Sequence, residues 1–166
     1  MELIGRMLDG SIAYDPQGGL EPSSSGLRQD DKMDRLEEVP LFQGCSRRQL
    51  RHVARIAETF DAPTGMTLAR TGEPGNQFFL ILDGSARVDV SPQKQRHLHP
   101  GDFFGEMSLL DGEPRSATVV AETAMRVLVI SRRNFATLLG EVPGLTQNLL
   151  VTLSKRVRQA EAALER

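Results

Sequence analysis

The sequence predicts a mainly β protein with flanking helices, and three observations lead to this fold class. Short segments rich in Val, Ile, Phe and Thr recur between residues 59 and 129, with glycines between them. Helix-type spacing of apolar residues precedes this region and follows it. The chain has 166 residues, the size of one domain. Many short strands separated by turn residues are typical of an antiparallel sandwich, a jelly roll or a small barrel.

The composition excludes several classes of protein. Lys and Arg total 20 against 22 Asp and Glu, for a net charge of -2, so we expect no nucleic-acid partner. The apolar runs are too short for a membrane span, and the N-terminus lacks the apolar core of a signal peptide. One cysteine, Cys45, cannot form an internal disulfide or a four-cysteine zinc site. We therefore expect a cytoplasmic protein.

The N-terminal part, residues 1–32, is expected to be a flexible tail. Residues 15–26 are mostly Pro, Gly and Ser, and a highly charged segment follows them. Such a composition buries too little apolar surface to offset the loss of chain entropy. In an alternative interpretation, the apolar residues between Leu3 and Ile12 dock as a short helix. We expect the folded domain to cover residues 33–166.

A first amphipathic helix is predicted from Arg47 to Glu58. Ser46 suits its N-cap, because a serine hydroxyl accepts a hydrogen bond from an N–H group of the first turn. Apolar residues then recur at spacings of three and four, which gives one apolar face and a basic outer face.

Four strands can be placed from the residues alone. Phe78–Leu82 and Ala86–Val90 flank Asp83-Gly84, a dipeptide typical of a β-hairpin turn. Ala117–Ala121 and Arg126–Ile130 are the other two.

Helical sequence returns at Ser131 and is expected to stop at Gly140. Pro143 can then begin a last helix that runs to Arg166, because proline is tolerated in the first turn. This helix carries an apolar stripe at alternating steps of three and four: Leu150, Leu153, Val157, Ala160 and Leu164. The stripe packs either on the chain's own roll or on a second copy as a homodimer seam.

The segment from Pro100 to Ala121 carries the chemistry. Gly105 is followed by a short helix start, which presents unpaired backbone N–H groups in one direction and favours an anion. Arg115 follows at the start of the next strand, and its guanidinium can hold two phosphate oxygens at once. The hydroxyl of Ser116 can add a further hydrogen bond.

Glu106 sharpens this interpretation. A carboxylate beside a phosphate needs a donor partner, and a ribose hydroxyl is the obvious one. A ligand that offers both groups close together is a 3′,5′-cyclic nucleotide. The alternative is an ordinary salt bridge between Glu106 and Arg115 across a turn.

From Leu41 onward the chain resembles a cyclic-nucleotide-binding domain of the catabolite-activator and FNR type. The resemblance depends on LFQGCSRRQL, on TGEPGNQFFLILDGSARV and above all on FGEMSLLDGEPRSATV, which is similar to the family's phosphate-binding cassette. It implies an eight-stranded antiparallel β-roll over residues 59–130, an N-terminal helix, and C-terminal helices over residues 131–166. It also implies a cyclic nucleotide between the roll and the last helix.

The resemblance also implies roles for individual residues. Gly105 and Met107 would offer backbone groups, Glu106 would accept from the ribose 2′-OH, and Arg115 and Ser116 would hold the phosphate. The remaining expected ligand contacts are Phe104 and Ala117 of the cassette, with Val88 and Leu98 around the base.

The last helix departs from the bacterial activators. Ala160 and Glu161 stand where a Thr-Ser pair of the family reads adenine, which leaves base selectivity open. Arg156 aligns with an arginine that approaches the ribose-binding glutamate, so it either caps the pocket or is a solvated charge. Ser116 favours cAMP, with cGMP as the other candidate ligand.

Two other functions fit parts of the sequence. His97-Leu98-His99 resembles a cupin metal motif, but a third strand histidine is missing, so we expect neither a metal nor an enzyme. The same fold can instead bind a partner or another effector without a cyclic nucleotide. With or without a cyclic nucleotide as its ligand, the chain is expected to be a stand-alone sensor without a helix-turn-helix domain. It would signal to an unidentified effector protein or to its dimer mate.

Overall fold

The computed structural model describes residues 21–22 and 27–164 of the chain. In chain order the elements are β1 (Glu21–Pro22), α2 (Gln29–Glu37), the 3₁₀ helix η1 (Pro40–Phe42), α3 (Arg47–Ile56), β2 (Glu58–Ala62), β3 (Thr67–Ala69), β4 (Gln77–Asp83), β5 (Ala86–Ser91), β6 (Lys94–Leu98), β7 (Phe103–Phe104), α4 (Glu106–Asp111), β8 (Thr118–Ala121), β9 (Met125–Ser131), α5 (Arg132–Glu141) and α6 (Pro143–Leu164).

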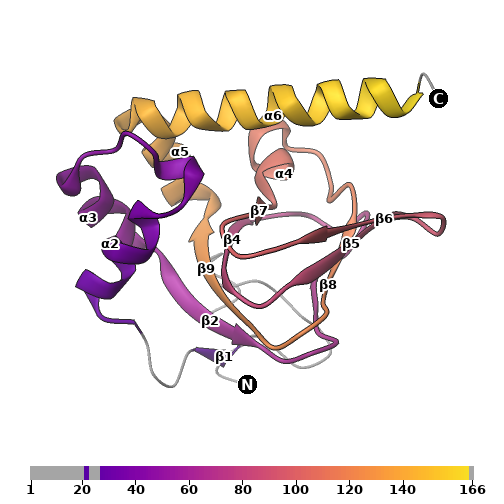
Figure 1. Ribbon diagram of the computed structural model, residues 1–166, viewed down its shortest axis with the longest axis horizontal. Coiled ribbons are helices and arrows are strands. Elements are labelled where there is room, and N and C mark those ends of the chain that lie inside the picture. The colour runs from indigo at the N-terminus through magenta and orange to yellow at the C-terminus, as the bar shows by residue number, and fades with distance from the viewer. Residues whose placement is uncertain (1–20, 23–26, 165–166) are drawn as a thin grey trace.

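The strands form two antiparallel sheets, in the orders β1-β2-β9-β4-β7 and β3-β8-β5-β6. Strands β2 to β9 are the predicted eight-stranded roll, and the two-residue β1 extends one edge against β2. Figure 1 shows α2 and α3 gathered at one side of the roll, while the long α6 crosses above it with α4 beneath. The predicted fold class is confirmed.

Strand β4 explains how one sheet serves two cores. Its side chains alternate, so that Phe78, Leu80 and Leu82 pack with the helices while Phe79 and Ile81 pack inside the roll. Strand β9 alternates in the same way against the same two clusters. A strand buried on both faces is apolar along its length, which accounts for the continuous apolar run FFLIL.

The first amphipathic helix is confirmed as α3, which ends at Ile56, two residues before the expected end. Ser46 caps it as predicted: its hydroxyl accepts from the Gln49 N–H, and the Gln49 side chain accepts from the Ser46 N–H. The inner face of α3 is buried through Leu50, Val53 and Ala54.

The predicted hairpin at Asp83-Gly84 is wrong. Strand β4 pairs with β9 and β7, whereas β5 pairs with β8 and β6, so this turn leads from one sheet to the other. Gly84 does adopt the left-handed conformation that the dipeptide predicts, with φ of 85°. The turn residues therefore specify the local reversal but not the partner strand, which depends on side chains packed elsewhere.

The C-terminal helices differ from expectation at one boundary. Helix α5 continues through Gly140 to Glu141, because Leu138 and Val142 are buried on either side and outweigh the cost of a helical glycine, about 1 kcal/mol. Pro143 begins α6 as predicted. The start of α6 is anchored to η1, where Asn148 Nδ2 donates to the carbonyls of Leu41 and Gln43 at 2.9 Å each.

The predicted tail over residues 1–32, including the segment from Leu3 to Ile12, lies largely outside the described residues and stays a prediction there. Its last residues belong instead to α2, which begins at Gln29. Met33 and Leu36 bury this helix against α3, so the folded part starts before residue 33.

Candidate functional site

A cleft opens between the cassette and α6, and we call it the α4 cleft. Its cavity is about 50 Å³, or about 430 Å³ when the open mouth is counted. The lining residues come from β3, β5, β6, β7, α4, β8, the segment before β8, and α6: Ala69, Val88, Arg96, Phe104, Gly105, Glu106, Met107, Ser108, Arg115, Ser116, Ala117, Val119 and Arg156.

Gly105 turns the chain from β7 into α4. It has φ of 93° and occupies the N-cap position, and no side chain caps the helix there. A Cβ at this position would lie 2.7 Å from the Gln77 carbonyl oxygen and 2.8 Å from Arg115 Nη1. Only glycine fits both the conformation and the space, so no side chain at this position can cap the backbone amides at the start of α4.

Arg115 lies deep in the cleft, with 8% of its surface exposed. Its Nη1 donates to the Gly105 carbonyl at 3.0 Å and its Nη2 to the Gln77 carbonyl at 2.9 Å. Burial lowers its pKa, the Glu106 charge raises it, and the Arg132 charge lowers it again. An arginine nevertheless stays protonated, so a cation is held in place with donors to spare.

Glu106 is the most buried charged side chain of the cleft, with 2% exposed. Its Oε1 accepts from Arg156 Nη1 of α6 at 2.5 Å. Arg156 also donates to the Phe103 carbonyl at 3.1 Å and lies over the Phe103 ring, 4.8 Å from its centroid. Of the two interpretations of Arg156, the structure shows the capping one. Within the described chain, Glu106 pairs with Arg156, and the alternative Glu106–Arg115 salt bridge is not formed.

Arg96 adds a third cation to the cleft. It lies on β6 opposite Val88 of β5. Burial lowers its pKa, the nearby Arg156 charge lowers it further, and Glu106 and Asp102 raise it. Three guanidinium groups therefore face one carboxylate around this cleft, a balance that suits an anion.

The structure brings most of the predicted residues together. Nine of them line the cleft: Val88, Phe104, Gly105, Glu106, Met107, Arg115, Ser116, Ala117 and Arg156. Leu98 is buried in the core of the roll opposite Ala86, and Ala160 is exposed on α6, so neither lines it. Their expected ligand contacts do not follow from this structure.

Four lining residues were not predicted: Ala69, Arg96, Ser108 and Val119. Strand alternation could have indicated Arg96, which stands two residues before Leu98 on the same strand. Ala69 and Val119 carry no signal in the sequence, because small apolar strand residues are usually core.

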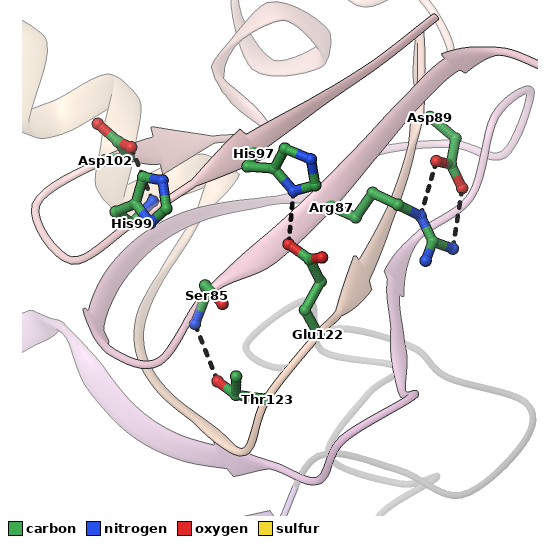
Figure 2. Close-up of polar contacts among 8 residues, drawn as sticks. All are labelled: Ser85, Arg87, Asp89, His97, His99, Asp102, Glu122 and Thr123. Carbon is green, nitrogen blue, oxygen red and sulfur yellow. Dashed lines mark hydrogen bonds and ion pairs between the residues drawn. The ribbon is translucent and has the colours of Figure 1, made fainter. Parts of the chain in front are cut away.

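The two histidines of the rejected cupin motif have different partners. Figure 2 shows His97 Nδ1 against Glu122 Oε1, at 2.7 Å, while the His99 backbone N–H donates to Asp102. In the described part of the chain, no group of three His, Cys, Asp or Glu side chains could hold a metal ion. Nor is any helix there long and apolar enough to cross a membrane.

Residues 60–141 match the family model of the cyclic nucleotide-binding domain. The chain belongs to the cyclic nucleotide-binding domain family. This is a regulatory binding domain, which supports the expectation that the chain is not an enzyme.

Individual relatives agree with this family. The chain is 37% identical over 125 residues to a cyclic nucleotide-gated potassium channel of Mesorhizobium japonicum, covering 75% of this chain and 35% of that protein. It is 37% identical over 114 residues to a cAMP-dependent protein kinase regulatory subunit of Colletotrichum orbiculare, covering 68% and 29%. The crystal structure of the Thermus thermophilus catabolite activator protein matches with a TM-score of 0.69 at 30% identity, covering 76% of this chain and 62% of that chain. The chain thus spans about a third of the length of these curated relatives.

Proposed function

We propose that the α4 cleft binds cAMP through its sugar and phosphate. The observation that carries this proposal is that a buried cation, Arg115, and a buried carboxylate, Glu106, line the same cleft at the uncapped start of α4. The phosphate would lie against Arg115, Ser116 and the amides of Glu106 and Met107. A guanidinium has five N–H donors, and the two carbonyls use only part of them.

Glu106 would accept a hydrogen bond from the ribose 2′-OH. A carboxylate has acceptor sites on both oxygens, so Glu106 can keep Arg156 on Oε1 and still accept from a sugar hydroxyl. The buried charge is thereby satisfied in the free and the bound protein, as a buried carboxylate requires.

The choice of cAMP over cGMP has two supports. Ser116, adjoining Arg115, is the small polar residue that the family resemblance associates with bacterial cAMP sites. The kinase regulatory subunit to which the chain is similar is described as cAMP-dependent.

Helix α6 would close over the ligand and report its presence to a partner. Among the described residues of α6, only Arg156 lines the cleft. The described part of the helix beyond Leu149 buries no residue fully. A ligand that binds the closed helix better than the open one shifts the population towards the closed form.

The same helix would join two copies of the chain. Leu150, Val157 and Leu164 of the predicted stripe are 55%, 56% and 86% exposed, so they do not pack on the chain's own roll. Sedimentation velocity should show a dimer that becomes monomeric in a Leu150→Glu, Val157→Glu double variant.

Calorimetric titration with cAMP, cGMP and 5′-AMP tests the proposed ligand. We expect micromolar or tighter binding of cAMP, weaker binding of cGMP, and much weaker binding of the acyclic nucleotide. Arg115→Ala should weaken cAMP binding by about 30-fold or more, because it removes charge-assisted hydrogen bonds of roughly 2–4 kcal/mol. Arg51→Ala, an exposed arginine on α3, is the matched control and should bind as the wild type. Absence of binding of both cyclic nucleotides to the wild type would refute the proposal.

A further inference from the structure

Arg132, the first residue of α5, connects three parts of the chain behind the α4 cleft. Its Nη2 donates to the Gly75 carbonyl at 2.7 Å and to the Ser108 carbonyl of α4 at 3.2 Å. Its backbone N–H donates to the Asn76 carbonyl at 2.8 Å. One residue therefore joins the loop before β4, the cassette helix and the start of α5.

The loop that Arg132 holds is also the loop that encloses Arg115. The Gly72 N–H donates to the Arg115 carbonyl and the Arg115 N–H donates to the Glu73 carbonyl, both at 2.9 Å. At the end of the loop, the Gln77 carbonyl accepts from Arg115 Nη2 at 2.9 Å. The position of this loop thus fixes both the backbone and the guanidinium of Arg115.

Gly75 shows how closely this loop approaches the Arg115 side chain. A Cβ at this residue would lie 2.6 Å from both Cζ and Nε of Arg115 and 2.7 Å from Ser108 Cβ. The Gly75 backbone is therefore packed against the cassette helix and the Arg115 guanidinium, and Arg132 donates to its carbonyl. Any displacement of this loop would therefore move the backbone groups that surround the Arg115 side chain, which we call the Arg115 slot.

We infer that Arg132 is a positioning residue of the anion site, which fixes the loop 72–77 and α4 around Arg115 and links both to α5. The inference rests on the proposed function in so far as the anion is the phosphate of a cyclic nucleotide. Arg132 does not line the cleft, so we expect it not to contact the ligand. It acts through Arg115.

The charges agree with this role. Arg132 is close enough to Arg115 to lower its pKa through repulsion, although burial has the larger effect. An anion bound at Arg115 relieves that repulsion, so ligand binding and the contacts of Arg132 stabilise each other. Helix α5 leads directly into α6. A change in the Arg132 contacts on ligand binding would therefore shift the start of α5 and, through the chain, α6.

The test compares Arg132→Gln, Arg132→Lys and the matched control Arg133→Gln. Arg133 is the next residue of α5, is exposed, and removing it costs the same charge. Calorimetry measures cAMP affinity, and hydrogen exchange on the ligand-free proteins measures the amides of Gly72 and Arg115. We expect Arg132→Gln to weaken cAMP binding roughly tenfold, as for the loss of hydrogen bonds from a charged donor. Arg133→Gln should stay within about twofold of the wild type, and Arg132→Lys should recover part of the loss.

Exchange separates positioning from general destabilisation. Arg132→Gln should speed exchange at Gly72 and Arg115 while amides at the centres of β4 and β9 keep their wild-type rates. The inference would be overturned if Arg132→Gln sped hydrogen exchange equally at all amides. It would also be overturned if Arg132→Gln matched Arg133→Gln in both cAMP affinity and exchange rates. If the wild type binds no cyclic nucleotide, the proposed function fails instead, and the ligand-free exchange comparison still decides whether Arg132 positions the Arg115 slot.

Discussion

The two ends of the α4 cleft are built differently. At the end where the sugar-phosphate would bind, Glu106 and Arg115 are almost fully buried, and both already form hydrogen bonds within the protein. At the end where the base would lie, Val88 and Arg96 come from two strands, and α6 buries no residue fully after Leu149. The buried end would face the part that all cyclic nucleotides share, whereas the end that would distinguish bases depends on the outer part of α6, which Arg156 joins to Glu106 and Phe103.

This difference suggests that the two ends contribute differently to affinity and to selectivity. Groups that are fixed before a ligand arrives lose little entropy on binding, so the sugar-phosphate end would provide most of the affinity. The α6 end would provide selectivity and the conformational response. The following variants separate the two contributions.

The largest effect is expected from Gly105→Ala. A side chain here combines a left-handed backbone, which costs about 1–2 kcal/mol, with an approach of 2.7 Å to the Gln77 carbonyl oxygen. We expect the free energy of unfolding to fall by about 3 kcal/mol and cAMP binding to be lost. Urea denaturation and calorimetry measure the two quantities.

Gly112→Ala is the control for Gly105→Ala. Gly112 is also left-handed, with φ of 74°, but a Cβ there would meet nothing within 4 Å. Its loss of stability should be about 1–2 kcal/mol, with binding retained. If the two variants lost the same stability and bound cAMP equally well, the close packing at Gly105 would not be needed for binding.

A smaller effect is expected from Glu106→Gln. The amide cannot match the carboxylate as an acceptor for the ribose hydroxyl, so cAMP affinity should fall roughly tenfold, the value of a charge-assisted hydrogen bond. The sharper readout is 2′-deoxy-cAMP. The wild type should discriminate against it, and the variant should bind both ligands about equally. Undiminished discrimination in Glu106→Gln would show that the 2′-OH is recognised elsewhere.

Arg156→Ala should affect α6 more than affinity. Arg156 is tied to Glu106 and to the Phe103 carbonyl, and its loss removes these contacts between α6 and the roll. We expect faster hydrogen exchange in the C-terminal half of α6 and a change in cAMP affinity below about tenfold, since no phosphate contact is lost. Arg158→Ala, an exposed residue of the same helix, should leave exchange unchanged. Equal exchange rates in the two variants would show that Arg156 does not hold α6 against the roll.

The same contrast appears in what the sequence could predict. The cassette was predictable because many positions of FGEMSLLDGEPRSATV agree with the family pattern at fixed spacing. The cap of α3 was predictable because Ser46 and Gln49 act locally. These features depend on residues near each other in the chain.

Features that depend on long-range packing were not predictable. Asp83-Gly84 indicates a turn, but the alternation of β4 between two cores decides that β5 joins the other sheet. The family resemblance implies Leu98 around the base, whereas Leu98 is buried in the core of the roll, opposite Ala86. The partner of Glu106 lies on α6, 50 residues away in the sequence, so the family resemblance could indicate Arg156, whereas local spacing indicated only Arg115.

Chemical-shift mapping by NMR tests the central claim most directly, because it locates the ligand in the wild-type protein. On titration of the ¹⁵N-labelled chain with cAMP, we predict the largest amide shifts at Gly105, Glu106, Met107, Ser116 and Ala117. Smaller shifts should appear along α6, and none on the outer face of α3. Unchanged cassette amides at saturating cAMP, or shifts centred on another surface, would contradict the account.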